Sequence, residues 1–281
     1  MKRLLTTTLL ALAAAATAAA QSRIETFTLH SEILNADKTC TVYLPDGYDR
    51  SEQDYPVLYL LHGASDTHTA WVEKGNMRQI ADEAFAAGTA RAMIVVMPDA
   101  SGEGPNHTGL HMGYFDVPGW EYERFFFEEF MPGIENRYRI LADKQHRAIS
   151  GLSMGGGGTA AYAFHHPELF SSACPMSALL DDISGSDDPA DTFHRSVRDN
   201  SPVRMLRGMS DEQIKPLRTV RWWVDCGDDD FLWRCNVDFY TLMRERNIPL
   251  QYRMRDGGHT WRYWQTVLPD VLTFVTNGFG K

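Results

Sequence analysis

The feature that most constrains the fold is the stretch ISGLSMGGGG at residues 149–158. The short apolar segment at 146–150 reads as a strand, and the alanine-rich segment after the glycines reads as a helix. Between them, Gly151, Ser153 and Gly155 form the pattern G-x-S-x-G, in which the serine occupies a sharp strand-to-helix turn. The glycines avoid side-chain collisions in so tight a turn. We therefore expect Ser153 to be a nucleophile at the start of a helix.

Other uses of a glycine-rich stretch fit these residues less well. A phosphate-binding loop of the form G-x-x-x-x-G-K-[ST] needs a lysine after the glycines, and none follows here. A dinucleotide site needs G-x-G-x-x-G early in the fold and an acidic residue about 20 positions later, and neither is well matched. An incidental flexible turn stays open as an alternative, because one G-x-S-x-G is only a moderate signal.

The rest of the chain alternates strands with helices. Two early segments, 24–34 and 38–45, alternate apolar and polar residues as antiparallel edge strands do. Strands that alternate with helices predict a mostly parallel sheet with helices on both faces. No linker rich in Pro, Gly or Ser divides the chain, so we expect one domain over 21–281, with a mainly polar insertion at 179–216. The further strands are expected at 57–63, 92–99, 171–178, 220–227 and 250–258, and the helices at 77–88, 119–138, 236–247 and 261–279.

The first twenty residues have the layout of a secretory signal peptide. Lys2 and Arg3 precede an alanine-rich apolar run, and small residues end that run at Ala20, before Gln21. The run is too short and too rich in alanine to span a bilayer well. We therefore expect cleavage after Ala20 and a mature protein that is secreted or periplasmic.

The charge and the cysteines exclude several classes of partner. The formal net charge is −10, which argues against nucleic acid, because binding phosphates needs an excess of Lys and Arg on some face. No later run is apolar for long enough to predict stable membrane insertion. The spacing of the four cysteines matches no zinc site, so we expect core thiols, no metal and no other cofactor. A disulfide between Cys226 and Cys235 stays open, because export would permit it.

A nucleophilic serine needs a base, and the base needs an orienting acid. On a turn of this kind the chain order is serine, acid, histidine. His259, in RDGGHTW after the last expected strand, can fold back over the end of the sheet and is the expected base. His165 and His166 fall on the helix after Ser153 and are expected to be structural. His194 is a weak candidate that could touch substrate.

The acid is expected after the strand at 220–227. Asp225 still lies on that strand and should face the helices or the sheet edge. Asp228, Asp229 and Asp230 all lie in the following loop, and their spacing does not separate them.

An oxyanion formed at the nucleophile needs two backbone N–H donors. Met154 follows the serine and supplies one. The second is expected from Ala64, next to Gly63 in the loop LLHGAS, while His62 is expected to brace this loop rather than to catalyse.

Five segments, in this order, resemble the esterase D-like α/β-hydrolases: YLLHGASDTHTAW, GWEYERFFFEEFMPGIENRYRI, HRAISGLSMGGGGTAAYAFHHPELF, VDCGDDDF and DGGHTWRYW. That family includes feruloyl and acetylxylan esterases, S-formylglutathione hydrolases, siderophore esterases and mycolyltransferases. The resemblance implies an α/β-hydrolase fold, and its CG-x-x-D turn implies that Asp230 is the acid. It supports Ser153 and His259 in the other two roles, with Ala64 and Met154 as oxyanion donors. The four consecutive glycines depart from the family pattern and suggest close packing.

The resemblance and the export signal together imply a secreted serine esterase that removes feruloyl or acetyl groups from plant polysaccharide such as xylan. A siderophore esterase or an acyltransferase on the same fold is the alternative, and a non-catalytic carbohydrate-binding protein is a remote one. Trp71, Trp120, Trp261 and the segment 179–216 are candidates for lining the substrate pocket. Each of these tryptophans could equally lie in the core.

Overall fold

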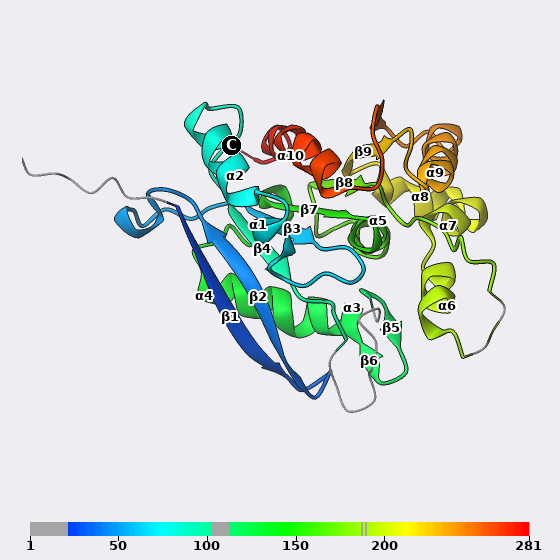
Figure 1. The fold of residues 1–281 in the computed structure, drawn as a ribbon, viewed down its shortest axis with the longest axis horizontal. Helices are drawn as coiled ribbons and strands as arrows, with labels where there is room; N and C mark the ends of the chain where they lie inside the picture. Colours follow the sequence, from blue (N-terminus) through cyan, green and yellow to red (C-terminus); the bar gives the residue numbers. More distant parts are fainter. Residues whose placement is uncertain (1–21, 103–112, 187, 189, 281) are drawn as a thin grey trace, which may run out of the picture.

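A computed structural model describes residues 22–102, 113–186, 188 and 190–280. Its centre is an eight-stranded sheet with the strand order β1-β2-β4-β3-β7-β8-β9-β10 (Figure 1). Neighbouring strands from β4 to β10 pair in parallel, and β2 and β1 extend one edge in antiparallel pairing, as the sequence predicts. The strands are β1 (Arg23–Ser31), β2 (Ala36–Leu44), β3 (Val57–Leu61), β4 (Ile94–Pro98), β7 (Arg147–Leu152), β8 (Ser172–Met176), β9 (Arg221–Gly227) and β10 (Leu250–Arg255).

Helices cover both faces of this sheet. One hydrophobic cluster joins α1 (Ala70–Glu73), α2 (Met77–Ala86) and α10 (Trp261–Thr276) to one face. A second cluster joins a further set of helices to the other face. These are α3 (Tyr122–Phe125) and α4 (Met131–Arg137), connected by the π-helical turn η2 (Phe126–Phe130), and α5 (Met154–His165), α7 (Pro202–Gly208), α8 (Asp211–Leu217) and α9 (Trp233–Glu245). A short hairpin, β5 (Asp116–Val117) and β6 (Trp120–Glu121), precedes α3.

The central strands are apolar throughout because both of their faces are covered. Every residue of β3 is buried. Val57, Tyr59 and Leu61 belong to the cluster on one face, and Leu58 and Leu60 to the cluster on the other. This division follows from the alternation of side chains along a strand, and it explains why a continuous apolar run marks a strand in a parallel sheet.

The segment 179–216 is more than the polar insertion that the sequence predicts. It contains α6 (Thr192–Asp199), all of α7 and most of α8. Val203 and Leu206, and likewise Ile214 and Leu217, are buried in the core. Each pair has the i, i+3 spacing that places two side chains on one helical face. The sequence pattern did not identify α7 and α8, which complete the covering of the sheet.

The predictions about cysteines and membranes have different outcomes. All four cysteines are buried free thiols, and the Cys235 thiol contacts the carbonyl oxygen of Ala178, so the alternative of a Cys226–Cys235 disulfide is wrong.

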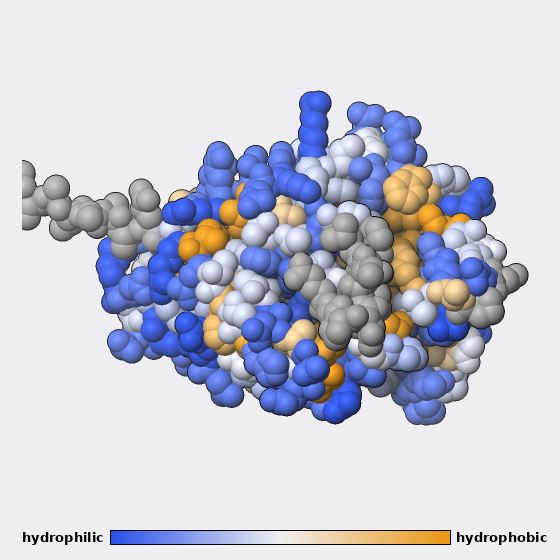
Figure 2. Space-filling model, turned by 60° about the horizontal axis from the view of Figure 1, so that its bottom comes forward, coloured by the Kyte–Doolittle hydropathy of each residue, from blue (hydrophilic) through white to orange (hydrophobic). Residues whose placement is uncertain are grey.

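Within the described residues, no helix is long and apolar enough to cross a bilayer. The face shown in Figure 2 is mostly hydrophilic, with hydrophobic side chains gathered in a few places. The expected signal peptide at 1–20 lies outside the described residues.

The four consecutive glycines let the start of α5 lie directly against neighbouring backbone. A Cβ atom on Gly155 would lie 2.5 Å from the His62 carbonyl oxygen, and one on Gly157 would lie 2.4 Å from the Leu179 carbonyl oxygen. Gly156 meets Ala178 at 2.6 Å, and Gly158 meets the Tyr114 side chain at 3.0 Å. Separations below 3.0 Å essentially never occur for real Cβ atoms. The departure from the family pattern therefore reflects close packing, as the sequence suggests.

Gly157→Ala is expected to destabilise the protein by about 1–3 kcal/mol, because its new methyl group meets a backbone oxygen that cannot move aside. Gly133→Ala in α4 is the matched control, since a Cβ there meets no atom within 4 Å. That change should be neutral or stabilising by up to about 1 kcal/mol, because alanine is the better helix former. Urea unfolding followed by circular dichroism measures both. Equal losses of stability in the two variants would contradict the packing argument.

Candidate active site

Ser153 lies at the end of β7 in a backbone conformation that non-glycine residues rarely adopt. Its φ is 55° and its ψ is −119°, and it is the N-cap residue of α5. Three backbone hydrogen bonds hold this turn: the Ser153 N–H donates to Met176, and the Ser153 carbonyl accepts from Gly157 and Leu179. Such strain persists only where the surrounding structure fixes it, and it aims the side chain away from the sheet.

The structure brings His259 and Asp230 into one line with Ser153. The Nε2 atom of His259 lies 2.9 Å from the Ser153 Oγ, and its Nδ1 lies 2.8 Å from Asp230 Oδ2. The carboxylate of Asp230 is fully buried, and its second oxygen accepts the Leu232 N–H at 2.8 Å. An N–H donated from Nδ1 to a carboxylate leaves Nε2 free to accept the serine proton. This arrangement can therefore generate a serine nucleophile.

The loops that hold Asp230 and His259 are bound to each other through their backbones. The Asp229 N–H donates to the Gly257 carbonyl at 3.0 Å, and the Gly257 N–H donates to Asp228 Oδ1 at 3.1 Å. A Cβ on Gly227 would lie 2.0 Å from the Gly257 carbonyl oxygen, so only glycine permits this approach. Asp228 and Asp229, which the spacing does not separate from Asp230, are exposed and help to join the two loops.

Asp225 anchors the helix that follows His259. Its buried carboxylate accepts hydrogen bonds from the Tyr263 hydroxyl on α10 and from Arg255 Nε at the end of β10, the latter at 2.9 Å. Burial raises the pKa of Asp225, although these two hydrogen bonds oppose the rise. As the sequence predicts, Asp225 faces a helix and the edge strand rather than the imidazole.

Ser153 opens into a cavity of about 230 Å³ whose walls include the expected oxyanion loop. The Met154 N–H is the first of α5 and so has no acceptor within the helix. The Ala64 N–H has no acceptor among the described residues, and Ala64 is exposed. The helix N-terminus also favours negative charge at this position. The arrangement is compatible with Ala64 and Met154 as oxyanion donors. The lining residues are Gly63, Ala64, Asp66, Leu152, Ser153, His259, Thr260, Trp261 and Trp264.

His62 is buried and braces the loop that presents Ala64. Its Nδ1 lies 2.8 Å from the Gly63 carbonyl oxygen, and its Nε2 accepts the Ala100 N–H at 2.9 Å. Asp99 lies beside it, with Oδ1 3.7 Å from Nε2. Burial alone would raise the pKa of Asp99, but His62, the charge of Lys38 and hydrogen bonds from Ser101 outweigh it and lower the pKa to about 2. These contacts agree with the bracing role expected of His62.

Of the three tryptophans expected to line the pocket, only Trp261 does so. Trp71 is fully buried, donates to the Leu61 carbonyl and packs edge-on against Trp261 with ring centroids 5.2 Å apart. Trp120 is also buried, donates to the Gly113 carbonyl and stacks on Tyr122. The predictions for Trp71 and Trp120 are wrong because both rings are in the core.

Trp264 also lines the cavity, although it was not among the residues predicted to do so. Its ring packs edge-on against the His259 imidazole with centroids 4.9 Å apart. It follows Trp261 at i, i+3, so both fall on one face of α10, and this spacing could have identified it. None of the described residues of 179–216, which exclude 187 and 189, is among the residues that line this cavity.

The three other histidines considered from the sequence, His165, His166 and His194, form ion pairs and do not line the cavity. His165 Nδ1 lies 2.6 Å from Glu123 of α3, and His166 Nε2 lies 3.5 Å from the same carboxylate, so both connect α5 to α3. This agrees with the structural role expected of them. His194 of α6 pairs with Asp191, the N-cap residue of that helix, at 2.7 Å and does not line the cavity.

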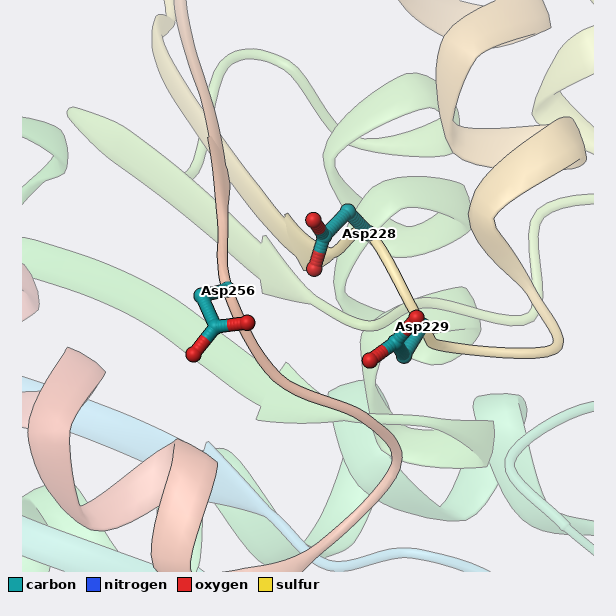
Figure 3. A group of neighbouring side chains, drawn as sticks. All are labelled: Asp228, Asp229 and Asp256. Carbon is teal, nitrogen blue, oxygen red and sulfur yellow. The ribbon is translucent and has the colours of Figure 1, made fainter.

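One group of carboxylates lies close enough together to suggest a cation. Asp228, Asp229 and Asp256 are exposed, and each can offer an oxygen within 4.8 Å of the others (Figure 3). The first two come from the turn after β9 and the third from the segment after β10. Sequence spacing misses this group because the two segments are far apart in the chain. Exposed acidic groups are common without an ion, and the expectation that no metal is needed stays a prediction.

The esterase family model matches residues 31–275. The chain belongs to the esterase family. A solved structure titled ferulic acid esterase is 45% identical and has a TM-score of 0.87, with 92% of this chain and 99% of that chain covered. The expected α/β-hydrolase fold and family are thereby confirmed, and the Ser153–His259–Asp230 arrangement is that of a serine carboxylic-ester hydrolase.

Two curated relatives are longer proteins. The chain is 36% identical over 151 residues to an endo-1,4-beta-xylanase/feruloyl esterase of Xylanibacter ruminicola. This match covers 52% of this chain and 20% of that protein. The chain is also 32% identical over 269 residues to an esterase of Mycobacterium tuberculosis. That match covers 84% of this chain and 54% of that protein. The chain therefore spans about half of the length of these relatives, or less.

Asp230→Asn is expected to lower kcat about 10³–10⁴-fold, because an amide no longer fixes the imidazole in the required tautomer. Asp228→Asn is the control, since its amide oxygen can still accept the Gly257 N–H. A surface hydrogen bond of this kind contributes about 1 kcal/mol, so the control should stay within about fivefold of the wild type. Steady-state hydrolysis of p-nitrophenyl acetate measures both. Comparable losses in the two variants would contradict the assignment of Asp230.

Asp99 is expected to make folding stability depend on pH. Its pKa of about 2 in the folded protein lies below the ordinary value of 3.8, so the unfolded chain binds the proton more readily. Asp99 then contributes about 2 kcal/mol above pH 4, and this contribution is lost as the pH falls through 2. Urea unfolding of the wild type and Asp99→Asn should differ by that amount at pH 6 and converge near pH 2. A difference that is constant with pH would contradict it.

Proposed function

We propose that the protein is an exported serine esterase that removes feruloyl or acetyl groups from plant polysaccharide such as xylan. The observation on which this rests is the hydrogen-bonded line from Ser153 Oγ through His259 to the buried carboxylate of Asp230. The alcohol and acyl parts of the substrate are inferred from the relatives named as feruloyl esterases and from the export signal in the sequence.

In the proposed reaction, Ser153 Oγ attacks the ester carbonyl carbon while His259 Nε2 takes the hydroxyl proton. The carbonyl oxygen becomes an oxyanion that accepts hydrogen bonds from the N–H groups of Ala64 and Met154. When the tetrahedral intermediate breaks down, the ester C–O bond breaks and His259 returns the proton to the leaving alcohol oxygen. Water then attacks the acyl-enzyme by the same route, and the carboxylic acid is released.

The cavity supports hydrolysis of a small or planar acyl group. Its walls combine two indole rings, Trp261 and Trp264, with the backbone of Gly63 and Ala64. A pocket that combines indole rings with polar groups suits ligands that combine an apolar body with a polar reacting centre. An acyl chain can lie against the indoles while the carbonyl oxygen meets the N–H donors.

A substrate panel tests the proposal. The purified protein should release acid from methyl ferulate, acetylated xylan and p-nitrophenyl acetate, and Ser153→Ala should lower these rates by more than about 10⁴-fold. A fluorophosphonate probe should label the wild type and leave the variant unlabelled. Preference for a catecholate triester would favour a siderophore esterase, and alcoholysis products would favour an acyltransferase. Absence of both labelling and turnover would overturn the proposal.

A further inference from the structure

Phe231, which the sequence analysis did not single out, is exposed directly beside the reacting groups. The residue is 62% exposed, the highest value among the exposed large hydrophobic residues that the structure describes. Its ring lies against the His259 imidazole, with centroids 4.5 Å apart. Single exposed hydrophobic residues are ordinary on protein surfaces. An exposed aromatic ring in contact with the base of a hydrogen-bonded Ser–His–Asp line is more informative, because a bound substrate must pass close to it.

The turn that carries Phe231 fixes its outward direction. Asp230 and Leu232, on either side of it, are buried. Hydrogen bonds from the N–H groups of Leu232 and Trp233 to Asp230, at 2.8 and 2.9 Å, close the turn between β9 and α9 (Figure 1). With both neighbours directed inward, the middle side chain projects to the solvent. The backbone that carries the ring is therefore fixed before any ligand arrives, and the ring contacts His259, which lowers the entropy cost of binding.

The reaction at Ser153 and His259 determines which part of a bound ester lies next to the Phe231 ring. His259 Nε2 must deliver a proton to the oxygen of the leaving alcohol, so the alcohol part lies on the imidazole side of Ser153. The carbonyl oxygen lies instead toward the N–H groups of Ala64 and Met154. Phe231 packs on the imidazole but, unlike Trp264, is not among the residues that line the cavity assigned to the acyl group, so we place it beside the alcohol part of the substrate.

We propose that Phe231 forms the binding surface for the alcohol part of the substrate, and that this alcohol is a sugar whose C–H face stacks on the exposed ring. The proposal rests on the proposed function and specifies one contact of the same site. A flat aromatic ring open to solvent suits a ligand that is apolar on one face and polar at its edges, as a pyranose or furanose ring is. A methyl or ethyl alcohol is too small to use it.

Trp233 extends the same surface along the chain. It is the first residue of α9 and is 40% exposed, and the Arg234 guanidinium lies over its ring at 4.9 Å. Only Leu232 lies between Phe231 and Trp233, so their Cα atoms are at most about 7 Å apart. A second sugar unit of an oligosaccharide can therefore reach Trp233, whereas an ester of a single sugar can bind at Phe231 without contacting Trp233.

The test uses four esters that combine two acyl groups with two alcohols. These are methyl ferulate, methyl acetate, a feruloylated arabinoxylo-oligosaccharide and an acetylated xylo-oligosaccharide. Phe231→Ala should raise KM for both sugar esters about five- to tenfold and leave both methyl esters within about twofold of the wild type. Phe231→Tyr should retain the wild-type preference, and Phe231→Leu should lose it, since leucine restores apolar contact with His259 but has no flat ring.

Controls separate the proposal from its alternatives. Phe85→Ala, which removes a half-buried ring of α2 that packs on Tyr43, should leave all four KM values unchanged. The pH profile of kcat on methyl ferulate should be the same in Phe231→Ala and the wild type if the imidazole is undisturbed. Equal losses on methyl and sugar esters would assign Phe231 to positioning His259 and overturn the proposal. A loss that follows the acyl group, or no loss at all, would also overturn it.

Binding without turnover separates this proposal from the proposed function. Ser153→Ala should bind an ester-free arabinoxylo-oligosaccharide by calorimetry, and the double variant with Phe231→Ala should bind it about five- to tenfold more weakly. If the wild type hydrolyses methyl esters but no sugar ester, the polysaccharide substrate of the proposed function fails, and this binding measurement still decides the role of Phe231. No difference in binding between the two variants would overturn the sugar surface.

Discussion

Helix α5 lies so close to the ends of β3 and β8 that its first turn has no room for a Cβ atom, and the position of Ser153 depends on this contact. The carbonyl oxygens of His62 and Leu179 occupy the space that side chains at Gly155 and Gly157 would need. The same approach places the N-terminus of the helix at Ser153, which lines the cavity. The glycines lower the intrinsic helix propensity of this turn, and close backbone packing offsets that cost.

A second close approach of backbones sets the distance between the acid and the base. Gly227 and Gly257 touch, and the loops on either side exchange hydrogen bonds through Asp228 and Asp229. Asp230 and His259 are each carried by one of these loops. Their hydrogen bond therefore depends on two short segments that the sheet brings together from adjacent parallel strands, β9 and β10. Asp225, on β9, connects this region to α10 by accepting a hydrogen bond from the Tyr263 hydroxyl.

The sequence could predict the sheet, Ser153 and His259, because each depends on local pattern and chain order. Continuous apolar runs follow from burial on both faces, and G-x-S-x-G follows from the steric demands of one turn. It could not separate Asp228, Asp229 and Asp230 without a family resemblance, because their burial depends on which way the turn faces. That direction is set by hydrogen bonds from Leu232 and Gly257, which no spacing reveals. Trp71 and Trp120 failed as lining residues for the same reason, since exposure depends on tertiary packing.

The acidic residues around the site differ in burial, and burial determines how strongly each can interact with His259. Asp228, Asp229 and Asp256 are exposed, so water and salt screen their effect on His259. Asp230 is buried, and its interaction with the imidazole is a short hydrogen bond that solvent does not weaken. The turn therefore directs one of three consecutive aspartates inward for chemistry and leaves the other two at the surface. The next residue, Phe231, alternates outward again, so a single turn supplies both the buried acid and an exposed ring against the imidazole.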